Sequence, residues 1–166
     1  MTPATSGKTP QANSAQTINT GAQRRLRILL IDDEELIRVY FRDVFWIHGL
    51  EERYELNLAG SIAQAEEALT NPTTRPDVVF LDLSLPIEIK GEMTISPAGG
   101  FYLLQKIKST PEWHAIKVIM FTGHSETEFR TEAEKAGADG YLVKGENLPQ
   151  DLIQYVDKLF SNAQRQ

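Results

Sequence analysis

Short apolar runs alternate with amphipathic segments along most of the chain. Four of these runs consist almost entirely of Val, Ile, Leu, Met, Phe and Tyr over strand length: residues 26–31, 77–81, 117–121 and 140–143. Near-continuous apolar runs are typical of strands that are covered on both faces of a parallel sheet. A further strand is expected over 54–59, where the run is shorter and more mixed. The pattern therefore predicts five parallel strands.

Helical periodicity fills the segments between these runs. Residues 34–48 carry apolar side chains at three- and four-residue spacing, and Gly49 provides the stop. Ser61 and Gln64 have the spacing of a capping box for the next helix, which Asn71-Pro72 ends.

Three more helices complete the alternation. They are expected at about 100–108, then after a capping box formed by Ser125 and Glu128 and closed by Gly137, and finally from near Asn147. Strands that alternate with helices imply an α/β fold, a doubly wound five-stranded parallel sheet with five flanking helices and right-handed crossovers.

Polar side chains follow four of the five strands at the point where each strand ends. Asp32-Asp33, Asp82, Thr122 and Lys144 occupy these positions. A single Asp there is often a turn residue or a helix cap, but parallel strands bring all their carboxyl ends to one edge, where open α/β sheets bind ligands. Carboxylates favour Mg²⁺, and an ammonium group favours phosphate. The sequence therefore predicts a site that handles a phosphoryl group.

Composition limits the classes of partner. Lys and Arg number 17 against 23 Asp and Glu in 166 residues, a net charge of −6, which argues against direct nucleic-acid binding. The chain has no Cys, so thiolate metal sites and disulfides are excluded. Neither a signal peptide nor a membrane span is indicated, and we expect a cytoplasmic protein.

The apolar pattern also divides the chain. Residues 1–23 are almost entirely small and polar, so we expect a disordered N-terminal tail. Residues 24–160 form the predicted domain, and 161–166 are expected to be a C-terminal tail.

The strand ends together resemble the receiver domain of two-component response regulators over roughly residues 24–160. The resemblance rests on Asp32-Asp33, on Asp82 within the segment 81–86, on Thr122-Gly123, and on Lys144 at the end of 141–144. These fragments occur in the family's order and at α/β spacing. The resemblance implies a flavodoxin-like sheet with the strand order 2-1-3-4-5.

The resemblance also implies a role for each residue. Asp82 would be the phosphoacceptor, supplied by a sensor histidine kinase or a phosphotransfer protein. Asp33 and Asp82 would ligate Mg²⁺ or Mn²⁺ directly, Asp32 through water, and Ser84 through its backbone carbonyl. Lys144 would pair with a phosphoryl oxygen and Thr122 would donate its hydroxyl to that group.

Output would follow from a switch. Thr122 would move toward the phosphoryl group and let the ring of Tyr141 turn from exposed to buried. The changed surface would bind a kinase, a downstream protein target or a second copy of the chain. The implied protein is a single-domain response regulator and a signalling phosphoprotein, not an enzyme with a separate substrate.

Two departures from the family pattern stand out. Gly145 follows Lys144, where the family usually has Pro, and this ending resembles the stand-alone regulators paired with bacterial phytochromes. Residues Ile87 to Gly99 are an insertion of about ten residues, which we expect to be a mobile surface loop. Of the three His residues, only His124 is expected near the phosphoryl group.

Two other functions fit parts of the pattern. A phosphohydrolase of the haloacid dehalogenase type also uses a strand-end Asp and Mg²⁺, but it needs a general acid two residues later, where this chain has Ser84. A pseudo-receiver adaptor that is never phosphorylated would normally lack part of the acidic cluster. Asp32, Asp33 and Asp82 are all present.

Overall fold

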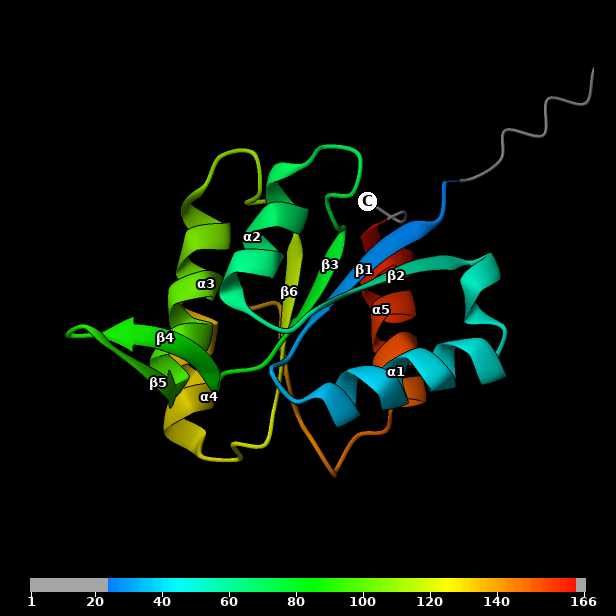
Figure 1. Cartoon of the computed structure of the whole chain (residues 1–166). Helices are drawn as coiled ribbons and strands as arrows, with labels where there is room; N and C mark the ends of the chain where they lie inside the picture. The colour runs from blue at the N-terminus through cyan, green and yellow to red at the C-terminus, as the bar shows by residue number, and fades with distance from the viewer. Residues whose placement is uncertain (1–23, 164–166) are drawn as a thin grey trace, which may run out of the picture.

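A computed structural model describes residues 24–163. Its strands are β1 (Leu26–Ile31), β2 (Tyr54–Ala59), β3 (Val78–Leu81), β4 (Leu85–Ile89), β5 (Glu92–Ser96), β6 (Lys117–Thr122) and β7 (Gly140–Val143). Five of them form one sheet in the order β2-β1-β3-β6-β7, in which every neighbouring pair is parallel (Figure 1). The predicted order 2-1-3-4-5 is therefore confirmed once the separate pair β4–β5 is set aside.

Five α-helices connect the strands and cover the sheet. They are α1 (Glu35–Ile47), α2 (Ile62–Thr70), α3 (Pro97–Ser109), α4 (Thr127–Lys135) and α5 (Pro149–Ala163), and a short 3₁₀ turn, η1 (Leu50–Glu52), precedes β2. The flavodoxin-like fold class predicted from the alternation is confirmed.

Two hydrophobic layers hold the helices to the sheet. Side chains alternate along each central strand, so Leu30 and Phe80 join the layer formed with α1 and α5, whereas Leu29 and Leu81 join the layer formed with α2, α3 and α4. All four are fully buried. Complete burial of each such side chain contributes about 1.5–3 kcal/mol, which explains why these strands read as continuous apolar runs.

Helix boundaries follow local capping chemistry in most places. Ser61 caps α2 by accepting a hydrogen bond from the backbone of Gln64 at 3.2 Å, as predicted. Gly49 and Gly137 have φ values of +60° and +95°, which suits their positions just beyond α1 and α4. The capping box expected from Ser125 and Glu128 is wrong, because α4 begins at Thr127 after Glu126, and Glu126 makes no side-chain capping bond.

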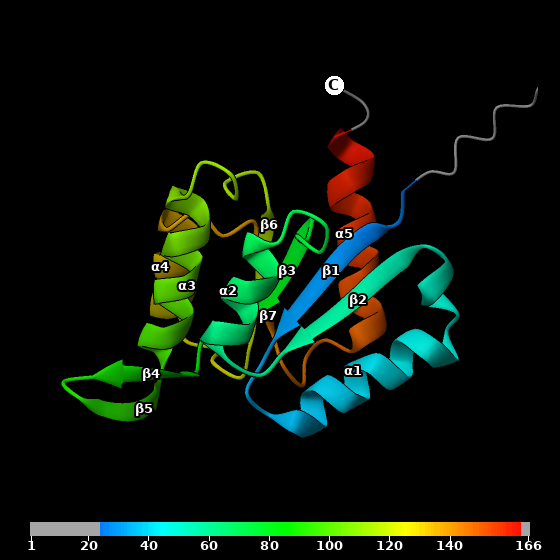
Figure 2. The ribbon, with the colours of Figure 1, turned by 45° about the horizontal axis from the view of Figure 1, so that its top comes forward.

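The insertion is the main correction to the predicted fold. Residues 87–99 do not form a loop: they form most of the antiparallel hairpin β4–β5 and the first turn of α3, which begins at Pro97 rather than near Gly100. Lys90 and Gly91 have φ values of +55° and +85°, so they make a two-residue turn with the twist of a hairpin. The hairpin projects sideways from the base of α3 (Figures 1 and 2).

The expected tails lie mostly outside the described residues. This holds for the whole segment 1–23 and for 164–166, and α5 continues to Ala163, three residues beyond the expected end of the domain at 160. Among the described helices, none combines the length and the apolar character needed to cross a membrane.

Candidate functional site

The carboxyl ends of β1, β3, β6 and β7 bring the predicted residues together at one edge of the sheet. Asp32 and Asp82 directly follow β1 and β3, and their backbone N–H groups extend the sheet by donating to Ala59 and Ile31, each at 3.0 Å. Lys144 follows β7 and donates from its backbone to Thr122 at 2.7 Å. Hydrogen bonds of the parallel sheet therefore position the backbone of each of these residues, independently of contacts between their side chains.

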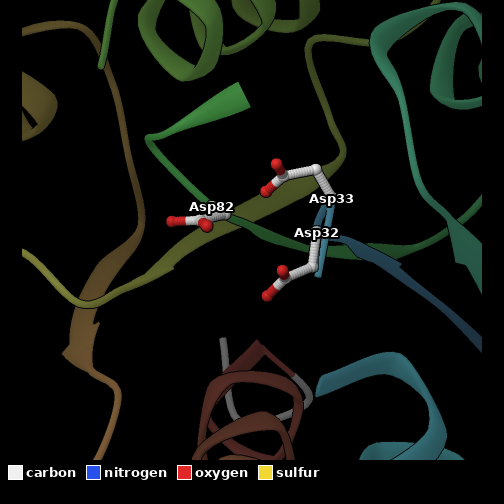
Figure 3. Close-up of side chains that lie close together, drawn as sticks. All are labelled: Asp32, Asp33 and Asp82. Atoms are coloured by element: carbon white, nitrogen blue, oxygen red, sulfur yellow. The ribbon is translucent and has the colours of Figure 1, made fainter. Parts of the chain in front are cut away.

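Three carboxylates form the acidic part of the site. One oxygen from each of Asp32, Asp33 and Asp82 lies within 4.8 Å of the other two, and Figure 3 shows the three groups extending toward the same side of β1 and β3. Asp32 is fully buried and Asp82 is 4% exposed, whereas Asp33 is partly exposed. Burial is the main reason that the pKa of Asp32 is raised above 3.8, and the nearby charge of Asp82 adds to this effect.

Lys144 supplies the positive charge of the cluster. Its Nζ lies 2.8 Å from Asp32 Oδ2, 2.9 Å from Asp82 Oδ2 and 3.6 Å from Glu34 Oε1. Burial alone would lower the pKa of Lys144, but the hydrogen bonds and charges of Asp32 and Asp82 raise it above 10.5. The ammonium group is therefore fully protonated at neutral pH and directed at the predicted phosphoacceptor.

The residue after Lys144 is accommodated without Pro. Gly145 has φ of +86°, a conformation that suits Gly, and the described residues contain no cis peptide bond. Lys144 still reaches Asp82, so the departure from the family pattern leaves the ammonium group in the site.

The loops that follow β3 and β6 are linked next to the site by a hydrogen bond between side chains. Ser84 Oγ and His124 Nε2 lie 2.9 Å apart, and the backbone of His124 donates to Thr122 Oγ1 at 3.3 Å. The backbone of Ser84 in turn approaches Asp82 Oδ1 at 3.4 Å. The prediction that His124 lies near the site is thus correct.

Tyr141 occupies a buried position in this structure. Its side chain is 6% exposed, its hydroxyl donates to the carbonyl of His124 at 2.9 Å, and the guanidinium of Arg130 lies 4.7 Å from the ring centre. Burial raises the pKa of Tyr141 to about 12. The exposed position expected before phosphorylation is therefore not the one observed.

Three residues near the site escaped the sequence interpretation. Arg38 donates to the backbone carbonyl of Asp32, Glu34 approaches Lys144, and Arg130 also donates to the carbonyl of Tyr141 at 3.1 Å. Arg38 and Arg130 lie on helices and Glu34 directly precedes one, and charged residues at such positions are ordinarily solvated. The only available signal was the six-residue separation of Arg38 from Asp32, which is too weak to identify a contact.

The donor set fits a hard divalent cation. Mg²⁺ and Mn²⁺ take carboxylate and carbonyl oxygens, and these are the groups that Asp32, Asp33, Asp82 and the backbone of Ser84 offer. Asp32 Oδ2 is buried and accepts no hydrogen bond of ordinary geometry, although it contacts the ammonium of Lys144. A cation with its bound water would satisfy that oxygen.

A flavodoxin-like sheet with clustered carboxylates and a lysine at the carboxyl ends of its strands defines the CheY-like class of signalling domain. The family model of the response regulator receiver domain matches residues 28–157. The chain therefore belongs to the response regulator receiver family of two-component systems.

Individual proteins agree with this assignment. The chain is 31% identical over 138 residues to the response regulator UvrY of Escherichia coli, a match that covers 82% of this chain and 55% of UvrY. The chain thus spans about half the length of such curated relatives.

Two solved structures share the fold. A CheY-like receiver domain protein of Methanospirillum hungatei has a TM-score of 0.67 and 24% identity, with 86% of this chain and 98% of that chain covered. The phosphorylated cyanobacterial phytochrome response regulator RcpA has a TM-score of 0.64 and 20% identity, with 82% and 91% covered.

Proposed function

We propose that this chain is a response regulator receiver that accepts a phosphoryl group on Asp82 from the phosphohistidine of a kinase or phosphotransfer protein. The observation that carries the proposal is the position of Asp82: its Oδ2 lies 2.9 Å from Lys144 Nζ, within a cluster of three carboxylates. A structural turn Asp would need neither a buried ammonium nor two further acids beside it.

The proposed reaction forms an acyl phosphate. An electron pair of the Asp82 carboxylate attacks phosphorus while the P–N bond of the donor breaks. The electrons of that bond remain on the imidazole nitrogen, which takes up a proton. Lys144, whose Nζ lies 2.9 Å from Asp82 Oδ2, would hold the carboxylate in position for this attack.

The remaining residues would stabilise charge on the transferred group. Lys144 would exchange part of its contact with Asp32 and Asp82 for a phosphoryl oxygen, and the Thr122 hydroxyl would donate to another. Asp32, Asp33, Asp82 and the carbonyl of Ser84 would hold Mg²⁺ or Mn²⁺, which lowers the repulsion between the carboxylates and the incoming phosphate.

Output would pass from Thr122 to Tyr141. The backbone N–H of His124 donates to Thr122 Oγ1, and the carbonyl of His124 accepts a hydrogen bond from the Tyr141 hydroxyl. A shift of Thr122 toward a phosphoryl group would therefore alter the hydrogen bond that holds the Tyr141 ring. Because Tyr141 is already buried, phosphorylation would strengthen an existing arrangement instead of creating it. A ligand shifts such an equilibrium only by its differential affinity for the two states.

The proposed setting is the cytoplasm, and the proposed output is a contact with a protein target. The net charge of −6 opposes direct binding to nucleic acid, which supports a protein as the receiver of the signal. No separate substrate is turned over in this scheme, because the phosphoryl group ends on Asp82 and is later lost to water.

Intact-protein mass measurement after incubation with acetyl phosphate tests the proposal. The wild-type chain should gain one phosphoryl group in Mg²⁺ and none in excess chelator, and Asp82→Asn should gain none. Asp43→Asn is the matched control and should be labelled like wild type, since this half-exposed carboxylate on α1 pairs with Arg42 and with no other cation of residues 24–163. Undiminished labelling of Asp82→Asn contradicts the assignment, and an unlabelled wild type favours the pseudo-receiver adaptor.

A further inference from the structure

The hairpin β4–β5 is separate from the main sheet and has no third strand among the described residues. A two-stranded ribbon is at best marginally stable by itself in water. Its first strand is well anchored, because Leu85 is fully buried and a Cβ on Gly99 would lie 2.5 Å from the Leu85 carbonyl oxygen. Its second strand is exposed from Glu92 to Ile95. The hairpin is therefore fixed on the β4 side and open on the β5 side.

The hydrogen-bonding pattern of the hairpin follows from its turn. Lys90 and Gly91 form a two-residue turn, so Ile89 and Glu92 are the hydrogen-bonded pair that closes it. Hydrogen-bonded and non-hydrogen-bonded pairs alternate in an antiparallel ladder. The pairs Glu88–Met93 and Pro86–Ile95 are then non-hydrogen-bonded, and their backbone groups point away from the hairpin. The missing N–H of Pro86 agrees with this register.

The two edges of the hairpin are unequal as a result. On the β4 edge, Pro86 has no N–H to offer a further strand, which is one way in which proteins blunt an edge. On the β5 edge, both Met93 and Ile95 present an N–H and a carbonyl, and neither makes another backbone hydrogen bond in the described part of the chain. Their side chains are 68% and 64% exposed. No Lys, Arg or Pro interrupts 92–96.

We propose that β5 pairs with β5 of a second copy of this chain, antiparallel about a two-fold axis at Thr94, to form a four-stranded sheet. In this register Met93 lies opposite Ile95 of the partner subunit and Glu92 lies opposite Ser96 of the partner subunit. Apolar side chains thus meet apolar ones, and no like charges are paired. The same pairs recur on both sides of the axis, as an isologous dimer requires.

Other registers of the same strand are poorer. An axis at Met93 would pair Ile95 with Gly91 of the partner subunit, which is in the turn and has φ of +85°. An axis at Ile95 would pair Met93 with Pro97 of the partner subunit, which lacks an N–H and begins α3. Only the axis at Thr94 uses both outward-facing residues of each strand. The pairing needs no phosphoryl group, so it goes beyond the proposed function and stands apart from the route through Tyr141.

Sedimentation equilibrium of the full chain, without a phosphoryl donor, is the first test. The average mass should rise with concentration from 18.7 kDa toward twice that value. The double substitution Met93→Lys and Ile95→Lys should weaken association at least tenfold, because four like charges then meet at the edge. Trp46→Lys, at a 76% exposed position on α1, should leave it unchanged. A chain that stays monomeric, or a dimer broken by Trp46→Lys and not by the double substitution, would overturn the proposal.

A cross-link tests the register itself. The chain has no Cys, so Thr94→Cys introduces a single thiol at the proposed axis. In the proposed dimer, Thr94 and Thr94 of the partner subunit form a non-hydrogen-bonded pair. The Cα atoms of such a pair lie about 4.5 Å apart, within the range of a disulfide. Mild oxidation should give a disulfide dimer of Thr94→Cys at least tenfold faster than of Glu88→Cys, an exposed position on β4. Equal rates for the two variants would show that Thr94 is not at an axis.

Both tests need a fold that is intact. Circular dichroism and phosphorylation by acetyl phosphate should be the same for the edge variants and for wild type, since neither Met93 nor Ile95 contacts the acidic cluster. Failure of all variants, wild type included, to accept phosphate would count against the proposed function and leave the dimer measurement valid.

Discussion

Asp32 shows, at the scale of one residue, how the acidic site opposes folding. Its carboxylate is fully buried beside Asp82, and burial raises its pKa above 3.8. The ionised form is therefore less favourable in the folded chain than in the unfolded one. Lys144 offsets part of this cost, but it is shared between Asp32 and Asp82. The negative charge of Asp32 therefore lowers the stability of the folded protein in the absence of a metal ion.

Asp32→Asn should therefore stabilise the metal-free protein at pH 7. Asn keeps the shape and removes the buried charge, while Lys144 retains Asp82. We expect a melting temperature higher by about 2–4 °C in excess chelator, equivalent to roughly 1 kcal/mol. The gain should shrink as the pH falls through the raised pKa and vanish below 3.8, where Asp32 becomes protonated in the unfolded chain as well.

Glu34→Gln is the matched control for this measurement, because Glu34 contacts the same ammonium at 3.6 Å and its side chain is 63% exposed. It should change the melting temperature by much less. A lower melting temperature for Asp32→Asn at pH 7 would mean that the pair with Lys144 outweighs burial.

At the scale of elements, the N-terminus of α3 packs closely against the segment that carries Asp82, the proposed phosphoacceptor. A Cβ on Gly100 would lie 2.5 Å from Leu83 Cα and 2.6 Å from the carbonyl oxygen of Asp82. The backbone of Gly100 also donates to Leu83 at 2.9 Å. The absence of a side chain at Gly100 thus lets α3 fix the path between Asp82 and the hairpin.

Gly100→Ala should be destabilising, because the added methyl group meets backbone atoms that cannot move independently. The expected loss is about 1–3 kcal/mol in the free energy of unfolding, measured by urea denaturation. Gly123→Ala, where a Cβ meets nothing within 4 Å, should change stability by less than about 0.5 kcal/mol. Equal effects at the two positions would refute the close packing of α3.

At the scale of the whole molecule, Asp139, directly before β7, joins α3 and β6 at the end of the sheet opposite to the site. It accepts hydrogen bonds from Lys108 of α3 at 2.7 Å, from Lys117 of β6 at 2.9 Å and from the backbone of Val118 at 2.9 Å. Burial acts to raise the pKa of Asp139, but these donors outweigh it and hold the pKa below 3.8. The ionised carboxylate therefore stabilises the fold.

Asp139→Asn should cost about 1.5–3 kcal/mol in the free energy of unfolding at pH 7, the range for hydrogen bonds to charged groups. Because the folded pKa is lowered, the stabilisation is complete above 3.8 and is lost as the pH falls through the lower folded value. Urea denaturation at several pH values should show the two proteins converging in acid. Asp43→Asn, whose side chain is 52% exposed, should show no such difference.

Local patterns in the sequence were enough to predict the sheet and the strand-end residues Asp32, Asp82 and Lys144 that the sheet brings together. Ile28, Phe80 and Ile119 belong to apolar runs that only a doubly covered strand explains, and the structure buries all three completely. Asp32, Asp82 and Lys144 were identified because each directly follows such a run. In a parallel sheet, that position along the chain already implies a shared edge in space.

Only the tertiary structure decided how the inserted segment and Tyr141, the proposed switch residue, are arranged. The turn at Lys90-Gly91 lacks the Asn-Gly or Asp-Gly pair that signals a hairpin most strongly in a sequence. The packing of Leu85 against the start of α3, which anchors the hairpin, is visible only in the structure. Tyr141 has the same sequence neighbours whether its ring is exposed or buried, and its position depends on contacts with His124, in the loop after β6, and with Arg130 of α4. The end of a strand follows from the local sequence, because the apolar run stops there. Contacts between elements depend on residues far apart in the sequence and form only when the elements pack.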